Sequence, residues 1–134
     1  MRKVILLILL IPFASSAQVP AEKNLAEKNN VVSARSKTQA KERLEIYRQR
    51  VLKGESMSTL AALYSEDPGS AANGGRYDGI ERGQFVPEFE AAAFSLMPGE
   101  ISEIFETQYG FHFVQLIARR GNVVDVRHIL VCPK

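Results

Sequence analysis

Two histidines, His112 and His128, are the side chains in this 134-residue sequence best suited to hydrogen-bonding or acid–base chemistry near neutral pH. Each lies in a segment rich in aliphatic residues, where a lone histidine is ordinarily a core residue with satisfied hydrogen bonds. A metal site would need at least a third ligand, and no such ligand is evident in the sequence. We therefore expect neither a metal ion nor a cofactor.

Other candidate chemistries lack support from the surrounding residues. Cys132 is the one cysteine, so no internal disulfide can form, and nothing near it indicates a nucleophilic or redox thiol. The glycines between residues 69 and 83 match neither GxxxxGK[ST] nor GxGxxG, which argues against a phosphate-binding loop. The net charge of +2 is too small to indicate binding to nucleic acid or to an anionic membrane.

Residues 1–17 have the pattern of a secretory signal peptide. Arg2-Lys3 forms a basic head, residues 4–13 are apolar apart from one proline, and small residues follow. The apolar run is short for a membrane span. We expect cleavage after Ala17, which brings the net charge close to zero; an uncleaved anchor is the alternative.

Elements that position the candidate residues can be predicted over residues 36–134, the expected folded domain. Residues 18–35 are polar without an apolar stripe and are expected to form a flexible leader or a frayed helix. Ser36 and Gln39 have the spacing of a capping box, so a helix is expected from Ser36 to about Gly54. A second short helix is expected to end at the turn Asp67-Pro68-Gly69. The apolar residues at helical spacing in these two helices are Ala40, Leu44, Tyr47, Val51, Met57, Leu60, Ala61 and Tyr64.

The later part of the chain predicts mainly strands. A glycine-rich loop over 68–84 with one short strand precedes a short helix beginning at Pro87. Strands are then expected over 101–105, 111–118 and 123–131, where β-branched and aromatic residues gather. Helices followed by antiparallel strands indicate an α+β domain in which the helices pack on one sheet.

Three stretches resemble the parvulin family of peptidyl-prolyl cis/trans isomerases. The first stretch includes Tyr64-Ser65-Glu66-Asp67. The second includes Gly74-Gly75 and Arg82-Gly83-Gln84-Phe85-Val86-Pro87. The third includes Pro98-Gly99-Glu100-Ile101 and Gln108-Tyr109-Gly110-Phe111-His112. Each is weak alone, but their order and spacing make the match specific. The resemblance implies a four-stranded antiparallel sheet flanked by helices and rotation of the peptide bond before proline.

The resemblance also implies a pocket of two histidines, an Asp or Cys, and an apolar wall for the proline ring. Carried over by position, the catalytic residues are Asp67, Thr107, His112 and His128, and the substrate-binding residues are Tyr77, Phe85 and Phe89. The plainer alternative is that Asp67 caps a turn and that Phe85 and Phe89 are ordinary core residues.

The loop Gly74-Gly75-Arg76-Tyr77-Asp78 departs from the Gly-Gly-Asp/Glu-Leu-Gly usual in the family, which leaves the pocket rim and substrate choice open. The basic loop of phosphate-specific members has no counterpart, so a phosphoprotein substrate is not expected.

The first strand of a parvulin is missing before residue 36, and a similar segment, residues 126–131, lies near the C-terminus instead. Either the sheet is permuted, with this segment replacing the first strand, or the segment is the relic of a second repeat. A three-residue loop at Arg119-Arg120-Gly121 would place His112 directly opposite His128 on one face of the sheet. A two-residue loop would place them on opposite faces. We expect the permuted sheet with the three-residue loop.

The resemblance implies an exported, periplasmic isomerase that assists the folding of exported proteins. Its partners would be unfolded or extended proline-containing polypeptides, with no nucleic acid and no membrane after signal cleavage; the oligomeric state is left open. One alternative is a catalytically weak peptide-binding chaperone, with Arg76 and Asp78 marking the weakened site. Another is a structural or dimerisation module that pairs through its last strand.

Overall fold

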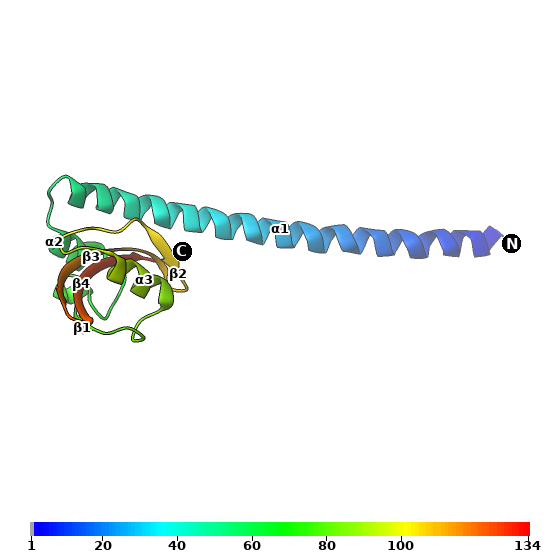
Figure 1. The fold of residues 1–134 in the computed structure, drawn as a ribbon. Helices are drawn as coiled ribbons and strands as arrows, with labels where there is room; N and C mark the ends of the chain where they lie inside the picture. Colours follow the sequence, from blue (N-terminus) through cyan, green and yellow to red (C-terminus); the bar gives the residue numbers. More distant parts are fainter. Residues whose placement is uncertain (1) are drawn as a thin grey trace. The chain divides into compact units, whose positions relative to one another are not determined.

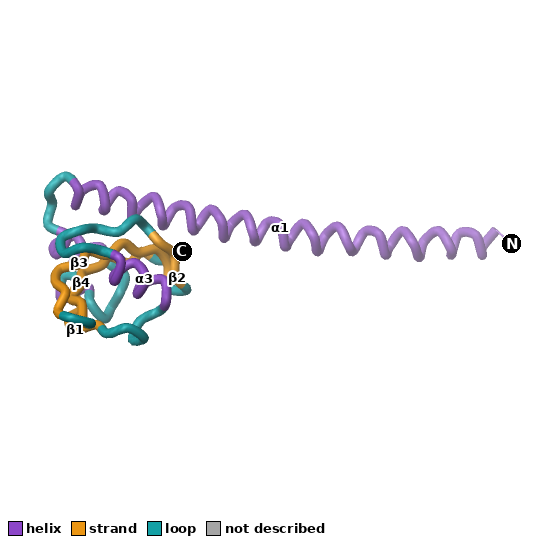
Figure 2. Tube along the Cα trace, in the orientation of Figure 1, coloured by secondary structure: helices purple, strands orange, loops and turns teal. Residues whose placement is uncertain are grey.

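The computed structural model describes residues 2–134, with side chains described from residue 25 onward. The chain forms two compact units, Met1–Arg35 and Ser36–Lys134. The second unit holds the end of the first helix and all the later elements (Figures 1 and 2). In chain order the elements are α1 (Arg2–Leu52), α2 (Met57–Tyr64), the 3₁₀ helix η1 (Ala71–Asn73), β1 (Arg76–Ile80), α3 (Pro87–Ser95), β2 (Phe105–Thr107), β3 (Gly110–Arg120) and β4 (Val123–Val131).

Helix α1 is longer than the sequence predicts. Residues 18–35 are helical, in line with the helix alternative expected for them, because their Ala, Glu and Lys are good helix formers even without an apolar stripe. The helix therefore passes through Ser36, whose hydroxyl donates to the carbonyl of Lys134 instead of capping a helix. The expected signal peptide, residues 1–17, falls where side chains are not described and stays a prediction. Within the described residues, we find no helix with the length and apolarity needed to cross a membrane.

The two short helices form where the sequence predicts them, although α2 ends at Tyr64, before the Asp67-Pro68-Gly69 turn. Helix α2 begins after Ser56, whose hydroxyl oxygen accepts the N–H of Thr59 at 3.2 Å. Helix α3 begins at Pro87, where a missing N–H costs nothing, and carries acidic Glu88 and Glu90 in its first turn.

The four strands form one antiparallel sheet in the order β1-β4-β3-β2. Strand β4 lies between β1 and β3, so the C-terminal segment completes the sheet as the permuted arrangement requires. The strand expected over 101–105 is wrong, because Ile101 makes only an isolated bridge to Gln115. The N–H of Ser102 donates to the carbonyl of Val114, but the N–H of Val114 donates to the hydroxyl oxygen of Ser102 instead of to a backbone carbonyl. This interrupts the backbone pairing with β3 before β2 begins.

Both faces of the sheet are covered, which explains why β3 and β4 read as nearly continuous apolar runs. The face toward α2 and the 36–52 part of α1 carries Phe111, Phe113, Ile129 and Val131, and the face toward α3 carries Val114, Leu116, Val124 and Val126. Because side chains alternate along a strand, His112 and His128 lie on the α3 face.

The β3–β4 hairpin differs from the expected one in its loop. Arg120 pairs with Val123, leaving the two-residue loop Gly121-Asn122, and Gly121 has the positive φ (61°) that a type II′ turn requires at this position. The expected three-residue loop and the direct opposition of His112 and His128 are therefore wrong. A β-bulge at Ile117 absorbs one residue, and this returns the two histidines to the same face.

Candidate active site

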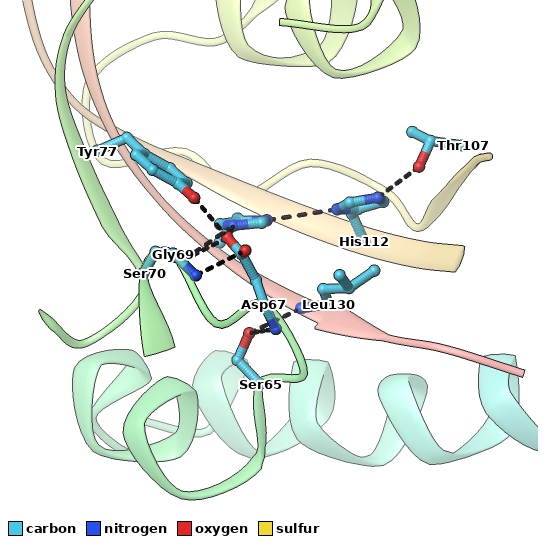
Figure 3. A network of polar contacts seen from close by, with 9 residues as sticks. Ser65, Asp67, Gly69, Ser70, Tyr77, Thr107, His112 and Leu130 are labelled. Atoms are coloured by element: carbon cyan, nitrogen blue, oxygen red, sulfur yellow. Dashed lines mark hydrogen bonds and ion pairs between the residues drawn. The ribbon is translucent and has the colours of Figure 1, made fainter. Parts of the chain in front are cut away.

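Asp67 is the common acceptor of a compact cluster of hydrogen bonds (Figure 3). Its Oδ2 lies 2.8 Å from His128 Nε2, 2.7 Å from Ser70 Oγ and 2.8 Å from the Tyr77 hydroxyl. Its Oδ1 accepts the N–H of Gly69 at 3.1 Å. The hydrogen bond from His128, supported by the other donors, holds the pKa of Asp67 well below its usual range despite burial. The carboxylate is therefore charged at neutral pH.

The sequence around Asp67 explains how this cluster forms. Asp67-Pro68-Gly69 folds as an Asx turn, in which the aspartate side chain binds the N–H two residues later. Ser70 then follows within reach of the same carboxylate. Helix α2 ends at Tyr64, where Ser65 takes an extended conformation, and Pro68 disfavours a return of Asp67 to the helical conformation.

A chain of hydrogen bonds runs from Asp67 across both histidines to Thr107 (Figure 3). His128 Nδ1 lies 3.3 Å from His112 Nδ1, and His112 Nε2 lies 2.7 Å from Thr107 Oγ1. The hydroxyl oxygen of Thr107 also accepts the N–H of Tyr109 at 3.2 Å. Both histidines are only 3% exposed, so water does not complete their hydrogen bonds.

These contacts restrict where the ring protons lie. Ionised Asp67 accepts only, so His128 carries a proton on Nε2. When His128 is neutral, its Nδ1 accepts from His112 Nδ1–H, and His112 Nε2 accepts the hydroxyl proton of Thr107. When His128 is protonated on both nitrogens, the direction of the last two hydrogen bonds reverses. Burial, together with the charge of His128, lowers the pKa of His112 to about 4, so His112 is neutral in either case at pH 7.

Aromatic rings enclose this polar chain. Phe85 lies between Tyr77 and Phe89, with ring centroids 5.0 and 5.1 Å away. Phe89 meets His128 edge to face at 5.1 Å and His112 at 6.0 Å. The expected apolar wall therefore contacts the histidines directly.

These residues line a pocket of about 560 Å³. Six of the predicted site residues line it, namely Asp67, Tyr77, Phe85, Phe89, His112 and His128, together with Glu66, Pro68, Gln84, Val86, Tyr109, Leu130 and Cys132. Thr107, the seventh, does not line the pocket; it hydrogen-bonds to Nε2 of His112, which does. Of the side chains described from residue 25 onward, the lining includes two carboxylates and no lysine or arginine.

Two residues that contact the histidines, Ser70 and Phe105, were not predicted as site residues. Ser70 is 1% exposed and contacts both Asp67 and His128 Nε2, the latter at 3.1 Å. Its spacing of three from Asp67 across a Pro-Gly turn could have indicated this. Phe105 stacks on His112 with centroids 5.2 Å apart, a contact set by the β2–β3 register that no local pattern reveals.

Arg76 and Asp78, the departures in the glycine-rich loop, do not reach the pocket. They form an ion pair of 2.7 Å with each other on the surface, while Tyr77 between them points its hydroxyl at Asp67. These substitutions therefore leave the pocket lining intact.

The arrangement is suited to non-covalent chemistry. The hydroxyls of Ser70, Tyr77 and Thr107 are all engaged within the hydrogen-bond network, and the pKa of the Cys132 thiol is raised by burial and by Glu66. Among the residues described, no group of three or more His, Cys, Asp or Glu is placed to bind a metal ion. The pocket can hold an apolar ring between the aromatic side chains and the hydrogen-bonded side chains of Asp67, His128 and His112.

Comparison with known proteins agrees with this geometry. The family model for the PPIC-type PPIase domain, or rotamase, matches residues 22–118. The chain is 50% identical over 78 residues to "Chaperone SurA" of Nitrosococcus oceani, covering 58% of this chain and 18% of that protein. It is 48% identical over 64 residues to "Foldase protein PrsA" of Geobacillus kaustophilus, covering 48% of this chain and 23% of that protein.

A solved structure, the peptidylprolyl isomerase PrsA of Bacillus cereus, superposes with a TM-score of 0.55 at 35% identity. The match covers 64% of this chain and 32% of that one. This chain thus spans a minor part of the relatives it matches. Strand β4 lies beyond residue 118, so His128 is supplied from outside the segment that the family model matches.

Proposed function

Because this chain belongs to the PPIC-type peptidyl-prolyl isomerase (parvulin) family, we propose that it catalyses cis/trans rotation of Xaa-Pro bonds in unfolded, exported polypeptides. The observation that carries the proposal is the hydrogen-bonded chain Asp67–His128–His112–Thr107 at the floor of an aromatic pocket. Its export is supported by the signal-peptide pattern of residues 1–17, and the periplasm is the compartment we propose.

Rotation about a peptide bond has a barrier of about 18–20 kcal/mol, whereas the cis and trans states of Xaa-Pro differ by only about 0.5–1 kcal/mol. No bond is made or broken, so the catalyst has only to bind the twisted amide better than either planar form. The twisted amide loses conjugation and is less dipolar, so an apolar pocket favours it over the planar amide.

Each part of the pocket has a role in this mechanism. Phe85, Phe89 and the ring of Tyr77 hold the proline ring, which fixes one end of the rotating bond. The buried histidines act as positioning groups that keep Asp67 and the aromatic rings in place, since their protons are committed within the network. Binding of the twisted amide in a pocket held in this way requires no proton transfer to the substrate.

The pocket lining also indicates the substrate class. Glu66 and Asp67 lie at the pocket, and among the side chains that the structure describes no lysine or arginine lines it to bind a phosphate beside the proline. We propose unmodified, extended chains as substrates.

The test is the isomerisation rate of a proline tetrapeptide with the intact protein and with Phe85→Ala. Met97→Ala is a matched control, because Met97 is 69% exposed and does not line the pocket. Acceleration by the intact protein and by Met97→Ala, with a loss in Phe85→Ala, supports the proposal. No acceleration by the folded, intact protein would refute it for that substrate. Truncation of β4 is a poor test, because this strand is interior to the sheet.

A second candidate function is a peptide-binding chaperone, favoured by the relatives named chaperone and by the mainly aromatic wall. Binding of peptide pairs that differ only by Pro→Ala separates the two. An isomerase site should lose affinity with the proline, whereas a chaperone site should follow the apolar content of the peptide.

A further inference from the structure

The outer edge of β4 beyond residue 128 is bound by the segment after α2 rather than by a strand. On this side the last backbone bond to the β1 region joins the N–H of His128 to the carbonyl of Gly75 at 2.9 Å. Two residues further on, the N–H of Leu130 donates to the hydroxyl oxygen of Ser65 at 3.1 Å. The carbonyl of Leu130 accepts the N–H of Glu66 at 2.8 Å.

The same segment also binds the N–H of Cys132, the residue directly after β4. Cys132 N–H donates to Glu66 Oε1 at 3.0 Å, and that oxygen also accepts from Arg43 at 3.0 Å. Ser65 and Glu66 therefore replace a strand partner, using one backbone N–H and two side-chain acceptors. Leu130 is 6% exposed, so its N–H has no ready access to water if Ser65 is lost.

The hydroxyl of Ser65 also connects this attachment to Asp67, which lines the pocket. The hydroxyl oxygen of Ser65 also accepts the N–H of Asp67 at 3.4 Å (Figure 3). One hydroxyl thus contacts both the backbone of Asp67 and the strand that carries His128. The carboxylate of Asp67 and Nε2 of His128 lie 2.8 Å apart, a contact that joins residues far apart in the sequence.

We propose that Ser65 and Glu66 are positioning residues of the pocket. They fix the chain before Asp67 to β4 in one register, and this sets the Asp67–His128 hydrogen bond. Their effect on isomerisation rests on the function proposed above, whereas their effect on the His128 ring can be measured without it.

The experiment uses the full chain labelled with ¹⁵N and records by NMR the Nε2–H signal of His128, which donates to Asp67. In Ser65→Ala we expect faster exchange of this proton with solvent and a changed chemical shift. Ser65→Thr keeps the hydroxyl and should restore both. Ser95→Ala is the control, because Ser95 is an exposed serine whose hydroxyl binds only its own helix.

The second measurement is kcat/KM for isomerisation of a proline peptide. We expect a loss of roughly tenfold in Ser65→Ala, as for a small displacement of a catalytic group, and recovery in Ser65→Thr. If the wild type shows no isomerisation, the proposed function fails and the NMR measurement alone decides the positioning role.

If Ser65→Ala does not fold, Glu66→Ala and Glu66→Gln provide the test. Gln keeps an oxygen for the N–H of Cys132 and should retain the wild-type His128 signal, whereas Ala should not. An unchanged exchange rate and chemical shift of the His128 Nε2–H in folded Ser65→Ala, or in folded Glu66→Ala, would overturn the proposal.

Discussion

His112 and His128 stack with ring centroids 5.5 Å apart and planes within 16°, although they lie diagonally across β3 and β4. Val114 is the residue directly opposite His128, and Leu130 is opposite His112. The diagonal offset brings the two Nδ1 atoms to 3.3 Å, and Phe105 stacks on the other side of His112. The pair therefore forms a rigid layer whose polar edges hold the hydrogen bonds of the pocket.

We predict that His112 makes the protein less stable as the pH falls from about 6.5 to 4. Its folded pKa of about 4 lies below the unfolded value, so the unfolded state binds more protons in this window. The stabilisation is complete above pH 6.5 and lost as pH approaches 4, an effect on the order of 3 kcal/mol. Urea unfolding at several pH values should show this slope in the wild type but not in His112→Gln. An identical slope in both proteins would contradict the buried, neutral state of His112.

Asp67 should contribute stability in a different pH window. Its folded pKa is lowered chiefly by His128, so its contribution is present above about pH 4 and fades as the pH falls below that value. Asp67→Asn should lose about 1–3 kcal/mol at pH 7, because charged hydrogen bonds are replaced by poorly matched ones. The difference from wild type should shrink below pH 4, as measured by thermal or urea unfolding. If the difference in unfolding free energy between wild type and Asp67→Asn stayed constant with pH, the charge of Asp67 would not be the source of its stabilising effect.

Tyr77→Phe should separate the two roles of this side chain. Burial, with the hydrogen bond to Asp67, raises the pKa of Tyr77 to about 12, so its hydroxyl remains a donor at every physiological pH. Removing the hydroxyl should cost about 1 kcal/mol of stability, while KM for a proline peptide changes little because the ring remains. Tyr77→Ala should raise KM as well. Equal kinetic losses in the two variants would argue that the ring does not contact the substrate.

Much of the fold follows from local sequence, and the reasons are visible in particular residues. Pro87 with acidic neighbours begins α3, Ser56 caps α2, and the apolar run over 123–131 forms β4 with the expected bounds. The bounds of these elements depend on neighbours in the chain, which a sequence displays directly. The resemblance predicted seven site residues; six of them line one cavity, and their roles stay predictions.

The relation between the histidines could be predicted only in part. The expected three-residue loop was wrong because Arg120 continues β3 to the turn, and the bulge at Ile117 compensates for this difference. A bulge has no reliable local signal, since it depends on how two strands meet. The contacts of Ser65 with Leu130 and of Phe105 with His112 join separate elements for the same reason.

The close approach of Gly75 to β4 gives the sharpest test of how the pocket is held together. Gly75 has φ of 78°, and a Cβ added there would lie 2.3 Å from the carbonyl oxygen of His128 and 2.9 Å from Ala61 Cβ. Gly79 has a similar φ of 68° but no heavy atom within 4 Å of an added Cβ. Both alanine variants carry the same left-handed strain of about 1–2 kcal/mol, so their difference isolates the clash with β4.

We expect Gly79→Ala to lose only that strain and to keep its kcat/KM. Gly75→Ala should lose about 2 kcal/mol more, since backbone at His128 must move. Its activity should fall at least about tenfold, because a shift of this strand displaces the ring bonded to Asp67. Urea unfolding and peptide isomerisation, measured on both variants side by side, check the two expectations. If the two variants were equally stable and equally active, the hydrogen bond from His128 N–H to Gly75 would not fix the position of the His128 ring.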